Sequence, residues 1–240
     1  MKFLFLICAL LYGAHFFKQN IQVQTQQIKQ QSVFIPPPQA LKFYNFGFED
    51  IISDVLWVRW IQNMETCGKD SVNRSSILNK NLTLDAEYSK YHRDLVCDQG
   101  WSFKMLDMIT DLSPKFRVPY SLGGPTLSVL AEDHIGAKKI FDKAAIQFPK
   151  DWSILYRAAY HYIFEINDLK TGSQLLKQAA DNGAPDWVYS YSAKISSQAG
   201  QYDFGISVLK QYLEKATTEE QKKSILEKIQ NLIAKKAAAL

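Results

Sequence analysis

The chain has 240 residues, of which 47% are hydrophobic and 22% charged, so it can form one large globular domain or a row of small repeated units. Its net charge is only +4, and its lysines are interspersed with acidic residues. This balance argues against a nucleic-acid-binding protein, which would carry a basic stripe.

The first segment, residues 1–18, has a basic start at Lys2 followed by an apolar run over residues 3–17. As a helix this run would span about 22 Å, less than the roughly 30 Å hydrocarbon core of a bilayer, so it fits either a membrane anchor or a signal peptide. A cleavage site needs small residues, and the bulky Tyr12 occupies one of those positions. We interpret residues 3–17 as an uncleaved membrane anchor, with a cleaved signal peptide and a buried helix as alternatives.

Residues 19–38 form a linker that has seven glutamines between positions 19 and 31 and ends in three consecutive prolines. The segment has too little apolar surface to fold alone, which indicates a spacer between the membrane and a domain that begins near residue 39. Lys2 favours a cytoplasmic amino terminus, although Lys18 and Lys29 weaken the charge difference. We therefore expect the bulk of the chain to be periplasmic or otherwise extracytoplasmic.

Residues 39–117 are expected to contain two helices, within GFEDIISDVLWVRWIQNM and GWSFKMLDMITDLSPKF, the second ending before Pro114. Between them, Cys67 and Cys97 are separated by 30 positions and enclose a largely polar stretch. In an oxidising compartment a disulfide between them would contribute about 3–4 kcal/mol by restricting the unfolded chain. The alternative is a pair of reduced, structural thiols.

C-terminal to this region, small and larger apolar residues alternate in a repeated pattern. Ala137, Phe141 and Ala144 lie on one helical stripe, and Pro149 ends that helix. The same rhythm recurs from Gly172 and from Gly205. The matching residues are Leu176, Ala179 and Pro185 in the second copy, and Leu209 and Tyr212 in the third. The starting positions 137, 172 and 205 are 35 and 33 residues apart, which gives a period near 34.

This period and pattern resemble the tetratricopeptide repeat over residues 118–216. The third copy matches best, through Gly200, Tyr202, Gly205 and Leu209, whereas the first copy has Pro125 inside its leading helix. The resemblance implies an all-α fold, a TPR-like α-solenoid of stacked antiparallel helix hairpins. FGFEDIISDVLW and the later MITDLSPKFRVPYSLGG are also similar to the opening of membrane-anchored bacterial TPR-like proteins whose roles are mostly unassigned.

The last segment, residues 217–240, is expected to be a C-terminal capping helix. Thr218 and Gln221 have the spacing of a capping box. The apolar residues expected on its inner face are Ile225, Leu226, Ile229, Leu232 and Ile233. Such a helix would shield the end of the stack from solvent.

We find no convergent set of catalytic or metal-binding residues. The histidines and cysteines form no ligand motif, and we expect His161 and Glu165 to be an exposed pair on one helix. Asp50 and Asp54 suit the start of a helix, and Gly123–Gly124 are expected to form a turn because they lack a phosphate-loop pattern. We therefore expect no enzyme activity, metal, cofactor or small-molecule substrate.

Aromatic residues in the leading helices offer the best candidate for a binding site. In tetratricopeptide-like stacks these helices line the inner groove, and aromatic side chains beside cations would suit an extended or helical protein segment. The candidate partner-binding residues are Tyr156, Arg157, Tyr160, Phe164, Trp187, Tyr191 and Lys194. The alternative is that these aromatics pack inside the core.

The sequence as a whole predicts a non-catalytic, membrane-anchored protein–protein interaction scaffold in a bacterial envelope complex. Its partners would be envelope or membrane proteins. The alternatives are a structural subunit of a larger envelope machine, or an envelope hydrolase that uses scattered carboxylates on a helical scaffold.

Overall fold

The computed structural model describes residues 35–63 and 100–239. The predicted anchor, residues 19–34 of the linker and the Cys67–Cys97 pair lie outside the described residues. The unit Pro38–Leu240 contains all the elements named below. The described residues form helices and no strands, which confirms the all-α class, and none of these helices has the length and apolar character needed to span a membrane.

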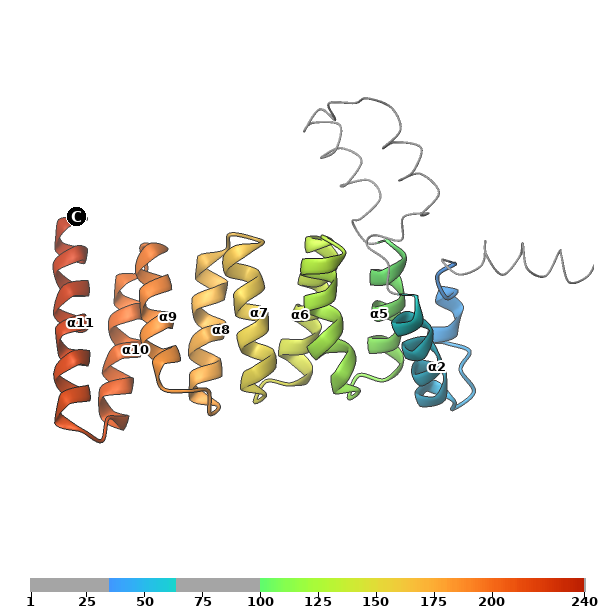
Figure 1. Ribbon diagram of the computed structural model, residues 1–240, viewed down its shortest axis with the longest axis horizontal. Coiled ribbons are helices and arrows are strands. Elements are labelled where there is room, and N and C mark those ends of the chain that lie inside the picture. The colour runs from blue at the N-terminus through green and yellow to red at the C-terminus, as the bar shows by residue number, and fades with distance from the viewer. Residues whose placement is uncertain (1–34, 64–99, 240) are drawn as a thin grey trace, which may run out of the picture. The chain divides into compact units, whose positions relative to one another are not determined.

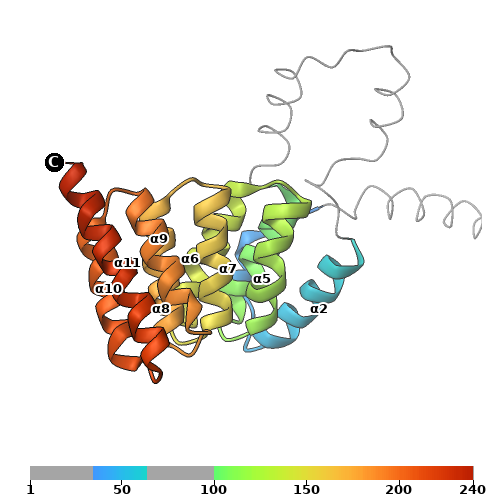
Figure 2. The same cartoon turned by 60° about the vertical axis from the view of Figure 1, so that its left-hand side comes forward.

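The helices follow one another in chain order, and most pack against the next one, as in an α-solenoid (Figures 1 and 2). The elements are the 3-10 helix η1 (Gln39–Lys42), α2 (Glu49–Gln62), α5 (Trp101–Leu112), the π-helical η3 (Pro119–Gly123) and η4 (Thr126–Leu130), α6 (His134–Gln147), α7 (Trp152–Phe164), α8 (Leu169–Asp181), α9 (Trp187–Gln198), α10 (Tyr202–Lys215) and α11 (Glu219–Ala238). The two helices expected within residues 39–117 are therefore present as α2 and α5, and α5 ends before Pro114.

Small residues at the repeated positions allow paired helices to approach closely. A Cβ atom added to Gly172 of α8 would lie 2.4 Å from Cγ1 of Ile163 on α7. One added to Gly205 of α10 would lie 2.6 Å from Oγ of Ser196 on α9. Ala137 of α6, at the corresponding position, is fully buried. The small residue in the sequence rhythm is thus the contact point between the two helices of a pair.

Gly123–Gly124 also serve close packing, and their assignment to a turn was wrong. Gly123 ends η3, and Gly124 keeps helical dihedral angles of φ −56° and ψ −55°. Added Cβ atoms would lie 2.6 Å from Leu106 of α5 and 2.8 Å from Phe141 of α6. The helical path continues past Pro125 into η4, where the Ala131 N–H donates to the Thr126 carbonyl in a π-helical bond.

The turns inside the hairpins repeat as the helices do. The backbone has positive φ at Glu132, Asn167 and Gly200, with values of 54°, 59° and 72°. Each of these residues directly precedes the residue that caps α6, α8 or α10. Positions 132, 167 and 200 are again 35 and 33 residues apart, so the period seen in the sequence is also a period of the backbone.

The final helix begins as predicted but buries a narrower stripe. Thr218 caps α11 by accepting a hydrogen bond from the Gln221 N–H at 3.2 Å, whereas the Gln221 side chain turns to the Thr217 N–H at 3.4 Å. Because α11 packs mainly against α10 alone, only part of the expected face is covered. Ile225, Ile229 and Leu232 are buried, and Leu226 and Ile233 are exposed.

Candidate functional site

Helix α7 is held so that one side faces the core and the other faces solvent. Asp151 caps it by accepting hydrogen bonds from the N–H groups of Ser153 and Ile154, at 3.1 and 3.2 Å. The inner side buries residues such as Leu155 and Ala159. The outer side therefore presents the predicted aromatics at their four-residue spacing.

Five predicted aromatic side chains from α7 and α9 lie together on one surface. We call this set the aromatic face: Tyr156, Tyr160, Phe164, Trp187 and Tyr191. The ring centroids of Tyr160 and Phe164 are 4.4 Å apart. Trp187 connects the two helices, because its centroid lies 5.8 Å from that of Tyr156 and 6.2 Å from that of Tyr191. Residues separated by up to 35 positions thus form one patch.

The aromatic face is only partly buried in the core. Tyr156 and Tyr191 are half-buried and pack against the core, which agrees in part with the alternative of interior packing. Tyr160, Phe164 and Trp187 remain 50%, 55% and 53% exposed. The face therefore consists of two half-buried rings that pack against the core and three rings that solvent can reach.

The two predicted cations belong to the same helices as these rings, Arg157 to α7 and Lys194 to α9. Arg157 donates through Nη1 to the Ser121 carbonyl, and neither Arg157 nor Lys194 contacts a carboxylate in the part of the chain that the structure describes. The pKa of Tyr191 is raised by burial and then by Tyr156 and Tyr160, so its hydroxyl stays neutral and can donate a hydrogen bond. The surface accordingly offers aromatic area and neutral hydroxyl groups, and the two helices that form it each carry a positive charge.

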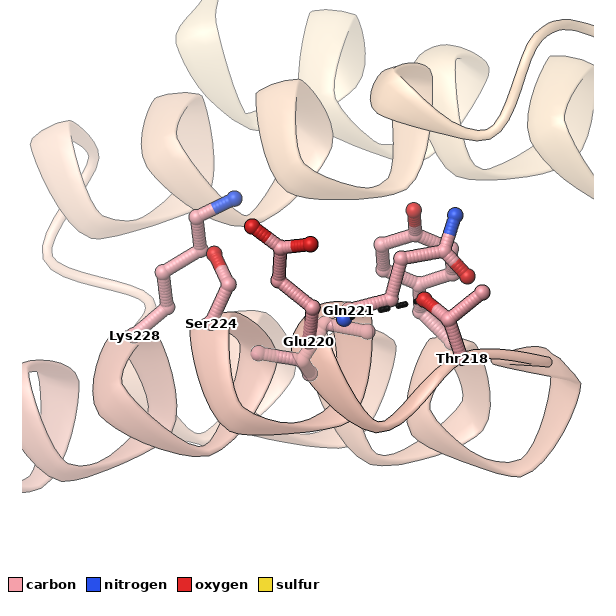
Figure 3. Close-up of a pocket in the computed structure, with 7 residues that line it drawn as sticks. Thr218, Glu220, Gln221, Ser224 and Lys228 are labelled. Carbon is pink, nitrogen blue, oxygen red and sulfur yellow. Dashed lines mark hydrogen bonds between the residues drawn. The ribbon is translucent and has the colours of Figure 1, made fainter.

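A shallow cavity of about 200 Å³ lies beside α11 (Figure 3). Figure 3 shows Glu220, Ser224 and Lys228 projecting from the same side of α11. Nζ of Lys228 donates to Oγ of Ser190 on α9 at 3.0 Å, and Ser190 adjoins Tyr191. Sequence reasoning missed this polar set, although its four-residue spacing was a readable signal.

His161 and Glu165 are not the exposed pair that the sequence predicted. His161 is 1% exposed, and its Nδ1 lies 2.8 Å from Oγ of Ser128. Its Nε2 lies 3.1 Å from the carbonyl oxygen of His134, which can only accept, so Nε2 carries the proton and the serine donates to Nδ1. Glu165 lies 3.5 Å from His134 instead. The prediction failed because helical spacing alone cannot show that η4 covers this side of α7.

The Ser128–His161 contact joins helices inside the protein. Ser128 is buried as well, so its hydroxyl is closed to a substrate. Burial lowers the pKa of His161 to about 4, and the ring is neutral near pH 7. This buried pair stabilises the packing of η4 on α7.

Acidic residues elsewhere are engaged by lysines. Asp107 and Asp111 on α5 lie 2.5 and 2.6 Å from Nζ of Lys143 on α6, and both also contact Lys42. Burial opposes ionisation of Asp111, but hydrogen bonds from Lys143 and Lys42 outweigh it and lower its pKa. No group of three potential metal ligands occurs within residues 35–63 and 100–239.

No family model matches this chain, and no curated protein or solved structure matches it either.

Proposed function

We propose that this protein is a non-catalytic scaffold that binds a protein segment on the aromatic face, and that its hairpins are tetratricopeptide-like. The observation that supports this most directly is the meeting of half-exposed rings from two successive leading helices. The period of 35 and 33 residues, found in both sequence and turns, supports the assignment to the repeat class.

The chemistry of the face specifies the kind of segment. Aromatic residues and arginine dominate the binding energy of protein interfaces, because they bury much area with little loss of side-chain freedom. The partner segment would place apolar side chains against Tyr160 and Trp187. Its carboxylates would meet Arg157 and Lys194, which have none of their own within the described chain.

We further propose that residues 3–17 anchor the scaffold in a membrane and that the domain is extracytoplasmic. The partners would then be envelope or membrane proteins. The basic start, the apolar run and the linker support this arrangement.

Photo-crosslinking tests the binding proposal. A photoreactive amino acid in place of Tyr160 should capture one protein in stoichiometric amounts in membranes of the source cell. The same group in place of the exposed Lys210 on α10 serves as the control and should not capture it. Equal capture at both positions, or none at position 160, would contradict a partner on the aromatic face.

A further inference from the structure

Helix α2 is apolar on two opposite sides. Its inner side buries Leu56, Trp57 and Trp60 against the rest of the fold. Its outer side carries Ile51, Val55 and Val58, which recur at the spacing of one helical stripe, and Val55 is 62% exposed. Ordinary surface helices have a polar outer side, so this exposed apolar stripe indicates a surface that interacts with another molecule or with a membrane.

The contacts of the inner side fix α2 in this orientation. Nε1 of Trp60 donates to Oγ of Ser102 at 2.7 Å, deep in the core. Oγ of Ser53 donates to the carbonyl oxygen of Ile109 at 3.2 Å, also buried. Rotating α2 to hide its outer stripe would break both bonds and expose two tryptophans. The stripe therefore stays outside.

The loop before α2 also exposes large apolar side chains. Phe43, Tyr44 and Phe46 are exposed, and Phe46 is 85% exposed. Phe46 also has a φ of 54°, which is a strained conformation for a bulky residue. The side chain of Asn45 supports this turn by accepting a hydrogen bond from the Gly47 N–H at 3.2 Å. The backbone thus holds an aromatic ring out in solvent at a cost in stability, which points to a functional role.

Charge selects among the environments that could cover this surface. The ionisable residues of α2 are Glu49, Asp50, Asp54 and Arg59, with an excess of acids. The nearby Lys42 is bound to Asp107 and Asp111 of α5. The surface therefore lacks the excess of basic side chains that draws proteins to anionic lipids or acidic partners.

The chain preceding α2 limits how far this surface can lie from residues 3–17. About 25 residues, from Lys18 to Lys42, separate the apolar run 3–17 from the exposed aromatics. A chain of 25 residues spans at most about 90 Å when it is fully extended. If residues 3–17 are inserted in a bilayer, α2 therefore lies within that distance of the same bilayer.

We propose that this outer face contacts the interfacial layer of the anchoring membrane through apolar contact with uncharged lipid. The outer face consists of Phe43, Tyr44, Phe46, Phe48, Ile51, Val55 and Val58. Aromatic rings favour this layer, and an apolar helix side can lie in it parallel to the membrane plane. The proposal rests on the membrane anchoring proposed above and is independent of the partner on the aromatic face.

Spin labels on the full chain in phosphatidylcholine vesicles test this contact. A spin-labelled unnatural amino acid is placed at position 46 or 55, so the native cysteines stay unchanged, and position 226 on α11 is the control. Labels at 46 and 55 should collide several-fold more often with lipid-soluble oxygen than with a water-soluble nickel complex. The label at 226 should show the reverse. Replacing a third of the lipid by anionic phosphatidylglycerol should not increase the contact.

Every other result overturns the proposal and shows which part of it fails. If the protein floats with the vesicles but the labels at 46 and 55 collide with the nickel complex as often as the label at 226 does, the anchor is supported and the lipid contact is ruled out. Labels shielded from both relaxants show that protein covers the face, either residues 64–99 or a second copy. If the protein does not float with the vesicles, both the anchor and the lipid contact are ruled out.

A second variant separates lipid contact from folding. Phe46→Asn suits the positive φ, so it should raise the unfolding temperature while reducing the oxygen collisions of the label at 55. An unchanged collision rate in this better-folded variant would show that the loop aromatics do not hold α2 at the membrane.

Discussion

At the scale of single residues, space decides which side chains the helix pairs can hold. Gly172 is the clearest case, because its missing Cβ is where Ile163 of the neighbouring helix lies. Alanine usually favours a helix over glycine by about 1 kcal/mol. In this contact the steric cost should outweigh that gain, since an added atom would come within 2.4 Å of a branched side chain near its backbone.

We predict that Gly172→Ala lowers the free energy of unfolding by about 1–3 kcal/mol, the usual range for overpacking. Gln174→Ala is the control, since Gln174 is exposed on the same helix and its replacement should change stability by less than about 0.5 kcal/mol. Urea denaturation followed by circular dichroism measures both. A stabilised Gly172→Ala protein would show that the two helices are further apart than described.

The buried His161 gives a pH dependence with a definite sign. Its pKa is about 4 in the folded protein and near the ordinary 6.5 when unfolded, so the unfolded chain binds the proton first as the pH falls. Stability is therefore fully present above about pH 6.5 and is lost as the pH falls toward 4. Between pH 7 and pH 4.5 this loss amounts to about 2–3 kcal/mol.

The matched variant is His161→Gln, which keeps a donor and an acceptor but does not titrate. We predict that the free energy of unfolding of the wild type falls by about 2–3 kcal/mol more than that of this variant between pH 7 and pH 4.5. Comparing the two slopes removes the contribution of carboxylates common to both proteins. Parallel slopes would mean that His161 is accessible to water and protonates normally.

At the scale of elements, the turns within hairpins combine a positive φ with a helix cap. Gly200 adopts φ of 72° with no atom near the position of an added Cβ, so a substitution there tests backbone strain alone. Asn167 occupies the corresponding turn of the previous hairpin. Asparagine tolerates this conformation better than alanine.

We predict that Gly200→Ala lowers the free energy of unfolding by about 1 kcal/mol and that Gly200→Asn costs less than half as much. Thermal and urea unfolding of the two variants would measure the difference. Equal costs for alanine and asparagine would show that the turns at 167 and 200 are not equivalent.

Helices were predictable from the sequence where their pattern is local. The apolar spacing within α7, α9 and α10, and the cap at Thr218, follow from residues three or four positions apart. The π-helical segment around Gly123–Gly124 was not predictable, because the glycines that suggest a turn are required by side chains of α5 and α6 far away in sequence. The half-covered face of α11 depends similarly on how many neighbours the helix has.

The candidate site was predictable to a similar degree. Spacing placed Tyr156, Tyr160 and Phe164 on one side of a helix, and the repeat pattern placed Trp187 and Tyr191 in the next leading helix. The contact between Tyr156 and Trp187 depends on how α7 and α9 are stacked, which only the fold shows. The reach of Lys228 to Ser190 is a tertiary contact of the same kind.

At the scale of the whole molecule, stacked hairpins commit one side of each helix to its neighbours and leave part of the leading helices open. The aromatic face follows from this division, since rings for which the core has no room remain at the surface. The proposed scaffold would bind through a few anchoring side chains, so the loss of two rings should abolish most of its affinity.

The most direct test of this account is the affinity of the partner captured at position 160, measured by titration calorimetry. We predict that Tyr160→Ala with Trp187→Ala weakens binding roughly 100-fold or more while the protein keeps its helical circular dichroism spectrum. The control, Ile146→Ala with Leu226→Ala, removes two exposed apolar side chains elsewhere and should leave the affinity unchanged within about twofold. Unchanged binding of the first variant, or equal weakening in both, would contradict the claim that the aromatic face holds the partner.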